Sequence, residues 1–231
     1  YSINLIFDIF CLNKNTSLKI YNAEQSILYG PVTSKENPNN GIFWTDLIKG
    51  ENIIIEVSII GNVTDGNNLH ISKVIHGYKN VFSSGFGQSD ACNRDIACPE
   101  GNNWHTDANA VAMLLLSDGT RFCTGTLLNN TTQNYTPYFL TAFHCLDVQN
   151  VDGVLSTSEM NAVNNWVFRF KYESPSCGGG DGTSYITFNG SSFRAAYQPS
   201  DFSLLELYSH PSVPLGISFA GWSRSNNAAT S

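Results

Sequence analysis

Short runs in which apolar residues occupy every second position recur along this chain of 231 residues, and they constrain its fold more than any other feature. Residues 3–9 and 53–59 both show the pattern. A period of two is that of a β-strand with one face turned toward a core. Only 13% of the residues are charged, and 19 glycines stand among many Asn, Ser and Thr residues that favour turns. The sequence therefore predicts an all-β protein.

The first part of the chain is predicted to be a small β-sandwich. Further strand-like runs lie at residues 18–21, 27–29, 41–44 and 69–75. Several short strands separated by turns at regular spacing are typical of a sandwich. Residues 83–90 then become small, polar and glycine-rich, which is the composition of an exposed linker. We therefore divide the chain into residues 1–85 and residues 86–231.

Residues 86–231 contain a second series of predicted strands. These lie at residues 110–116, 122–128, 138–141 and 166–172, as a strand pair across residues 186–197, and at residues 200–207. Asp118-Gly119 predicts a tight hairpin turn after the first of them, and residues 146–165 are predicted to be a polar loop. A barrel closed from about six strands leaves no bare sheet edge. The second part is therefore predicted to be a β-barrel.

His144 is the leading candidate for chemistry because it follows an apolar, β-prone run. Histidine is the side chain whose ordinary pKa lies nearest neutrality, so one held at the end of a strand can act as a general base. The competing interpretation is a core histidine with satisfied hydrogen bonds. Asp201 precedes a later strand, where it either satisfies a turn or accepts the Nδ1 proton of His144. Histidine before aspartate is the order of the chymotrypsin-like arrangement.

Cys145, directly after His144, is a poor alternative nucleophile. Neighbouring residues of a strand project to opposite faces, so a cysteine next to its own base is badly placed to use it. His70 and His76 have no carboxylate or cysteine close to them in the sequence and are predicted to be structural or surface residues. No cofactor is predicted.

The charge and hydropathy of the chain exclude two kinds of partner. A net charge of −7 argues against nucleic acid and against anionic membrane surfaces. The longest apolar run, residues 110–116, is far too short to cross a bilayer.

Six cysteines, at positions 11, 92, 98, 123, 145 and 177, form no Cys-x2-Cys pair. Cys92, Cys98 and His105 could supply three ligands, but their spacing fits no common zinc site, so no metal is predicted. Five cysteines between residues 92 and 177 favour disulfides formed in an oxidising compartment. The chain is therefore predicted to be secreted.

Four linked motifs resemble the lysyl endopeptidases, which are secreted bacterial serine proteases of chymotrypsin-like fold. They are Cys-Thr-Gly-Thr-Leu-Leu-Asn-Asn at 123–130, the run at 138–145, Ser-Asp-Phe-Ser-Leu-Leu-Glu-Leu at 200–207 and Ala-Gly-Trp at 220–222. Residues 92–101 resemble the start of the mature chain, and residues 1–80 resemble the end of the pro-region before it. Bulky Phe143 departs from the wider fold, which usually has a smaller residue or a histidine there.

The resemblance implies a secreted serine endopeptidase that cleaves protein or peptide substrates and is a monomer when complete. His144 would be the general base and Asp201 its partner. The family's serine lies in a Gly-x-Ser-Gly motif of a second barrel, and this sequence contains no such motif. We therefore expect a fragment with the end of the pro-region and the first barrel of a two-barrel protease, without nucleophile, oxyanion hole or lysine-specificity pocket. The alternative is a non-catalytic, secreted β-rich binding module that keeps the protease framework.

The resemblance also implies disulfides between Cys123 and Cys145 and between Cys98 and Cys177. Cys92 would be unpaired here because its family partner lies in the second barrel, and Cys11 has no counterpart that we can assign.

Overall fold

The computed structural model describes residues 2–26, 28–38, 40–61, 66–77, 93–116, 122–180, 182, 184–211 and 215–224. Strands dominate these residues, and neighbouring strands pair antiparallel throughout. The predicted all-β class is confirmed. No helix within the described ranges is long and apolar enough to cross a membrane.

Residues 2–77, called the N-terminal unit below, form two small sheets. Their strands are β1 (Ser2–Cys11), β2 (Thr16–Asn22), β3 (Leu28–Thr33), β4 (Phe43–Trp44), β5 (Ile48–Lys49), β6 (Ile53–Ile59) and β7 (Asn68–Gly77), with a 3₁₀ turn, η1 (Ser34–Glu36), after β3. One sheet is built on β1, which pairs with β7, β4 and β5, and the other has the order β3-β2-β6. Apolar residues of β1 and β2, among them Phe7, Leu18 and Ile20, form a shared core.

β6 is an exception to the expectation of one buried face. Ile55 and Val57 occupy alternate positions, as the sequence pattern indicates, but they are 37% and 42% exposed. β6 is also an edge strand, which pairs only with β2 among the described strands. The period of two therefore predicts this strand correctly, but the apolar residues that it selects are not in a core.

Residues 93–224 form the barrel unit around a seven-stranded sheet. Its strands are β8 (Val111–Leu115), β9 (Phe122–Leu128), β10 (Tyr138–Thr141), β11 (Val167–Phe170), β12 (Ile186–Asn189), β13 (Ser191–Tyr197) and β14 (Phe202–Leu207), in the spatial order β12-β11-β8-β9-β10-β14-β13. Aromatic and aliphatic side chains from facing strands, such as Phe139, Phe168 and Leu205, are fully buried in its core.

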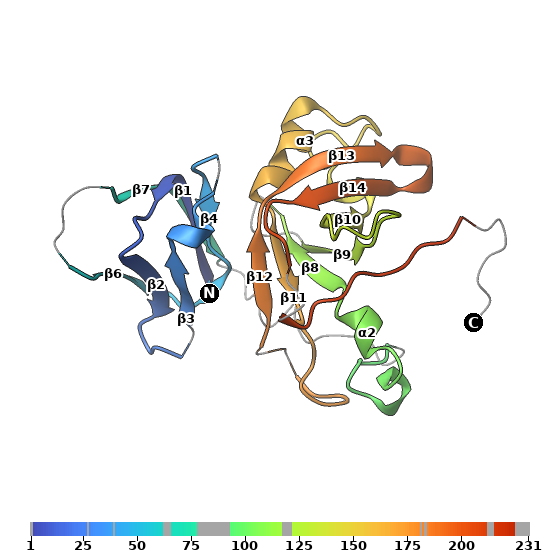
Figure 1. Cartoon of the computed structure of the whole chain (residues 1–231), viewed down its shortest axis with the longest axis horizontal. Coiled ribbons are helices and arrows are strands. Elements are labelled where there is room, and N and C mark those ends of the chain that lie inside the picture. The colour runs from blue at the N-terminus through green and yellow to red at the C-terminus, as the bar shows by residue number, and fades with distance from the viewer. Residues whose placement is uncertain are drawn as a thin grey trace.

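The two end strands of this sheet are consecutive pieces of one chain segment. β12 pairs with β11, β13 pairs with β14, and only Gly190 separates them. Gly190 has a φ of +75°, and a Cβ there would lie 2.7 Å from the carbonyl oxygen of Asn164, so glycine is required at this corner. The bent segment therefore brings the sheet round on itself as a barrel (Figure 1). This agrees with the predicted barrel of about six strands.

The predicted polar loop at residues 146–165 is wrong in part. It contains helix α3 (Thr157–Ala162) and the 3₁₀ turn η4 (Val163–Asn165). Ser156 and Glu159 form a reciprocal capping box that starts α3. The remaining short helical elements are η2 (Pro99–Gly101), α2 (His105–Ala108), η3 (Phe143–Cys145) and η5 (Gln198–Ser200).

Three sequence-based expectations lie outside the described residues. They are the division of the chain at 85/86 with its linker at 83–90, the turn at 117–120, and Cys92. The division into domains therefore stays a prediction.

Candidate active site

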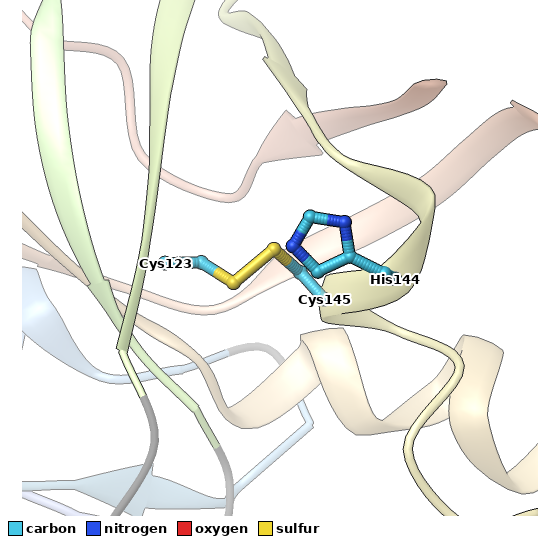
Figure 2. Close-up of side chains that lie close together, drawn as sticks. All are labelled: Cys123, His144 and Cys145. Carbon is cyan, nitrogen blue, oxygen red and sulfur yellow. A yellow bond between two sulfur atoms is a disulfide. The ribbon is translucent and has the colours of Figure 1, made fainter. Parts of the chain in front are cut away.

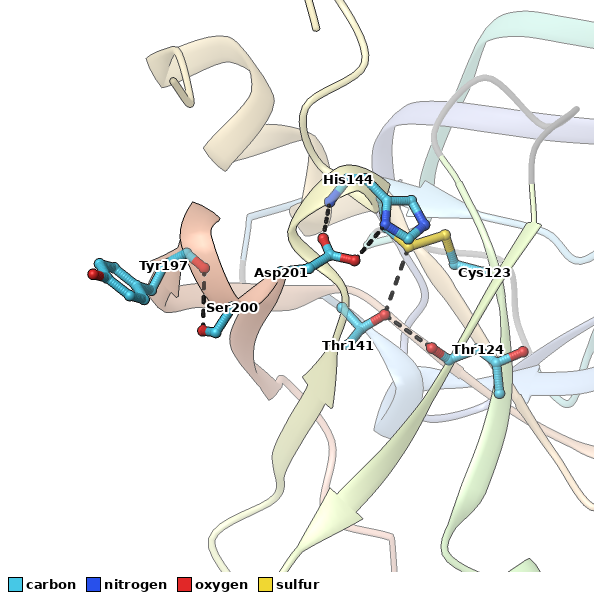
Figure 3. Close-up of polar contacts among 8 residues, drawn as sticks. Cys123, Thr124, Thr141, His144, Tyr197, Ser200 and Asp201 are labelled. Carbon is cyan, nitrogen blue, oxygen red and sulfur yellow. Dashed lines mark hydrogen bonds and ion pairs between the residues drawn. A yellow bond between two sulfur atoms is a disulfide. The ribbon is translucent and has the colours of Figure 1, made fainter. Parts of the chain in front are cut away.

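Two neighbouring strands bring His144 and Asp201 together, although 57 residues separate them in the sequence. β10 and β14 are antiparallel neighbours, with Thr141 opposite Ser203. The chain leaving the end of β10 therefore lies beside the chain entering β14. His144 is in η3, directly after β10, and Asp201 is the residue before β14. Figure 3 shows the two side chains facing each other.

The Asp201 carboxylate holds His144 by two hydrogen bonds. Oδ2 lies 2.8 Å from Nδ1 of the imidazole, and Oδ1 accepts the backbone N–H of His144 at 3.0 Å. These bonds, first the backbone N–H and then the ring, hold the pKa of Asp201 below its usual value. Since the carboxylate accepts, Nδ1 carries the imidazole proton and Nε2 is left as a proton acceptor.

The turn at Asp201 is itself fixed by the backbone. Asp201 has a φ of +49°, a left-handed conformation that Asp and Asn adopt more readily than most residues. Its carbonyl oxygen accepts the N–H of Phe143 at 3.1 Å. Both the main chain and the side chain of Asp201 therefore bind η3, which sets the direction of the imidazole.

The pair is open to solvent. The His144 side chain is 70% exposed and that of Asp201 is 53% exposed. Among the described residues, none hydrogen-bonds to Nε2 of His144. The nitrogen that a general base would use is therefore accessible.

A disulfide anchors η3 to the barrel beneath the histidine. Cys123 on β9 is bonded to Cys145, which is 3% exposed, one residue after His144. Next to this disulfide, Thr141 donates a hydrogen bond to the carbonyl oxygen of Thr124 at 2.9 Å (Figure 3). Gly125 follows on β9, and a Cβ there would lie 2.3 Å from the ring of Phe139, so only glycine lets β10 pack this closely.

The same disulfide excludes two other functions for this corner. Sulfur atoms of Cys123 and Cys145 lie within 4.8 Å of the His144 ring, the kind of cluster that could hold a metal. Figure 2 shows that the two sulfurs are bonded to each other. A metal ligand or a cysteine nucleophile must be a free thiolate, so Cys145 can be neither while the disulfide is intact.

The structure also bonds Cys98 to Cys177, so it contains both disulfides that the resemblance implies. Cys98 is therefore not available to the zinc set considered with Cys92 and His105. Cys11 is free and exposed. Close to the Cys98–Cys177 disulfide in the sequence, the Asp95 carboxylate accepts the backbone N–H of Gly178 at 2.7 Å.

Glu159 is a residue that sequence reasoning missed. It is 1% exposed, and its carboxylate accepts the N–H groups of Val148, Gln149 and Ser156. These bonds, the one from Gln149 most strongly, lower its pKa from 4.5 to about 2. Glu159 thereby orders the segment that follows His144. The Ser-x-x-Glu spacing at 156–159 was the sequence signal for it.

A second histidine–aspartate pair lies on the N-terminal unit. Nδ1 of His70 on β7 is 2.6 Å from Oδ1 of Asp8 on β1, and the two side chains are 62% and 50% exposed. The sequence indicated no carboxylate near His70, because Asp8 comes from the neighbouring strand. His70 is nonetheless a surface residue, as predicted.

Comparison with known proteins gives a consistent family. The family described as lysyl endopeptidase, C-terminal domain, matches residues 86–231. A lysyl endopeptidase of Pseudomonas aeruginosa is 28% identical over 207 residues, which cover 83% of this chain and 42% of that protein. Since residues 86–231 are less than two thirds of the chain, an alignment of this extent must reach into residues 1–85. The chain thus spans less than half the length of this relative.

Proposed function

The chain belongs to the lysyl endopeptidase family, a family of proteases, and from this we propose that it is part of a secreted serine endopeptidase with His144 as general base and Asp201 as its orienting partner. The observation that carries the proposal is the hydrogen-bonded pair at 2.8 Å, held from adjacent barrel strands.

The proposed chemistry follows from the tautomer. Asp201 keeps the proton of the imidazole on Nδ1, so the exposed Nε2 can take the proton of a serine hydroxyl as that oxygen attacks a peptide carbonyl. The imidazolium then gives the proton to the leaving amine, and Asp201 stabilises the positive charge that forms on the ring.

The serine and the oxyanion donors are proposed to lie in the part of the protein that corresponds to the rest of the relative's length. The sequence of 231 residues has no Gly-x-Ser-Gly motif to supply them. Cleavage after lysine is proposed from the family name, because the residues of a specificity pocket would lie in that same part.

Secretion is proposed from the cysteines. Two disulfides form in the barrel unit, and such bonds persist in oxidising compartments and are rare where thiols are kept reduced.

Residues 1–85 are proposed to be a removable pro-region. The resemblance on both sides of the linker, and an alignment to a relative that reaches into these residues, support this. N-terminal sequencing of the secreted, active, full-length enzyme tests it. A mature start between residues 85 and 91 supports the proposal, and active enzyme that still begins within β1 contradicts it.

Substitution of the proposed base tests the catalytic assignment. In the full-length enzyme, His144→Ala should lower kcat on a lysyl ester or peptide by several orders of magnitude, because the members of a triad act as a unit. His105→Ala is the matched control, since it removes an exposed histidine from the barrel unit, which the mature enzyme would keep.

Equal activity of His144→Ala and wild type, with unchanged folding by circular dichroism, would remove His144 from the mechanism. A full-length wild type that binds peptides without cleaving them would instead favour the non-catalytic module.

A further inference from the structure

The outer face of β11 is buried, although it points away from the barrel core. Phe168 and Phe170 alternate with Val167 and Arg169, and the two phenylalanines belong to the core. Val167 and Arg169 must therefore project outward. Both are nearly inaccessible, at 1% and 2% exposure, so another part of the molecule covers this face.

The N-terminal unit provides the cover. Ile6, Trp44 and Leu47 pack against Leu115 on β8 and Val167 on β11 in one buried cluster. Figure 1 shows the β1–β4 side of the N-terminal unit next to β12 and β11. We call this surface of β8, β11 and β12 the docking face.

An ion pair lies within this apolar contact. Arg169 donates from Nε to Oδ2 of Asp46 at 3.0 Å and from Nη2 to Oδ1, which makes the contact bidentate. Both side chains are 2% exposed. Asp46 also accepts the hydroxyl of Thr187 on β12 and the backbone N–H of Leu47. The buried carboxylate is therefore well satisfied by both units.

Aromatic side chains of the barrel unit orient the Arg169 guanidinium. Its guanidinium carbon lies 4.1 Å from the ring centroid of Tyr185 and 5.2 Å from that of Tyr172. Two aromatic rings orient a planar cation at little cost. On the other side, Thr45 fixes the loop that carries Asp46 by exchanging hydrogen bonds with Leu5 of β1.

We propose that Arg169 is the centre of a docking face specific for the N-terminal unit, and that Asp46 is the group it recognises. An apolar patch with a buried, bidentate pair favours a partner that brings a carboxylate to that point, because a partner without one would desolvate Arg169 and supply no bidentate acceptor. The proposal rests on the proposed function, in which residues 1–85 become a separate chain.

The docking face is distinct from the candidate active site. Among the described residues of the N-terminal unit, none is hydrogen-bonded or ion-paired to His144 or Asp201. His144 stays 70% exposed with the unit in place. The N-terminal unit therefore binds the barrel without covering the imidazole.

The test uses the full-length protein carrying His144→Ala in every sample, to prevent self-digestion. A recognition sequence for a site-specific protease is inserted between residues 78 and 92 and cut after folding, and association of the two pieces is measured by sedimentation. Cut protein with Asp46 and Arg169 intact should remain associated at micromolar concentration.

Asp46→Ala should raise the dissociation constant on the order of 100-fold or more, because it takes the bidentate carboxylate away from the buried Arg169. Asp46→Ala with Arg169→Met should recover most of the association, since the buried cation is removed together with its carboxylate. Asp8→Ala, which removes an exposed carboxylate of the same unit, should change nothing. If Asp46→Ala does not fold, Asp46→Asn replaces it with the same expected direction.

Two results would overturn the proposal. In the first, the two pieces of the cut protein separate although Asp46 and Arg169 are both intact. In the second, the Asp46 variants and the protein with both residues intact have equal dissociation constants. Neither depends on whether the natural enzyme removes residues 1–85, which N-terminal sequencing decides separately.

Discussion

At the scale of single residues, His144 and His70 each face an aspartate at hydrogen-bonding distance, 2.8 Å and 2.6 Å respectively. The difference lies in how the aspartate is held. Asp201 accepts the backbone N–H of His144 as well as its ring, and its own carbonyl accepts the N–H of Phe143. Asp8 meets His70 across two strands of an open sheet face. Asp8 takes its backbone hydrogen bonds from its own strand, at Asp8 and Ile9, whereas Asp201 binds the backbone of the histidine that it orients.

Asp201→Asn should lower kcat of the full-length enzyme by about 10⁴-fold. The amide can donate to Nδ1, which would move the imidazole proton to Nε2 and leave no base for the serine. Asn also adopts the left-handed conformation that Asp201 has, so the turn should survive. Steady-state kinetics with a lysyl ester measures the loss, and Asp107→Asn, at an exposed aspartate of the barrel unit, is the control. A loss below tenfold would show that Asp201 does not orient the base.

At the scale of elements, periodicity and turn residues predicted the barrel strands because each strand turns apolar side chains toward the core. The position of His144 after β10 could be predicted because the histidine follows the apolar run that forms this strand. α3 was missed because residues 146–165 are polar and lack a helical apolar stripe, so only the Ser156–Glu159 capping box marked it. A strand pair across residues 186–197 was predicted, but the closure at Gly190 was not, because the sequence does not show which neighbouring strand each half joins.

Glu159→Gln should destabilise the protein in a pH-dependent way. The pKa of Glu159 is lowered from 4.5 to about 2 in the folded state, so its ionised form favours folding. That stabilisation is fully present above about pH 4.5, amounts to about 3 kcal/mol, and is lost as pH falls toward about 2. The variant should therefore unfold at lower urea concentration near neutral pH.

At about pH 2, Glu159→Gln and wild type should unfold at nearly the same urea concentration. Glu51→Gln, a change at an exposed glutamate of the N-terminal unit, should track wild type at every pH. A constant difference between Glu159→Gln and wild type across this range would mean that Glu159 acts through packing and not through its charge.

At the scale of the whole molecule, the pairing of Asp46 with Arg169 could not be predicted, because 123 residues separate them and neither belongs to a motif. The sequence nonetheless contained one indication that the outer face of this strand is covered. Arg169 interrupts the apolar run at 166–170, where an outward position on a barrel strand would ordinarily be accompanied by other polar residues. A strand apolar on both faces indicates that both are covered, and the arginine indicates that the outer cover carries a charge.

The 231 residues alone should not hydrolyse peptides or lysyl and arginyl esters, because a base without a positioned nucleophile can at best activate water. An oxyanion donor typically lowers the barrier by about 2.7–4 kcal/mol, and the family's donors belong to the proposed second barrel. Ester hydrolysis by the purified chain, beside the full-length enzyme as positive control, measures this. Turnover that His144→Ala abolishes would show that these residues contain their own nucleophile, and the proposed division of the active site between two barrels would then be wrong.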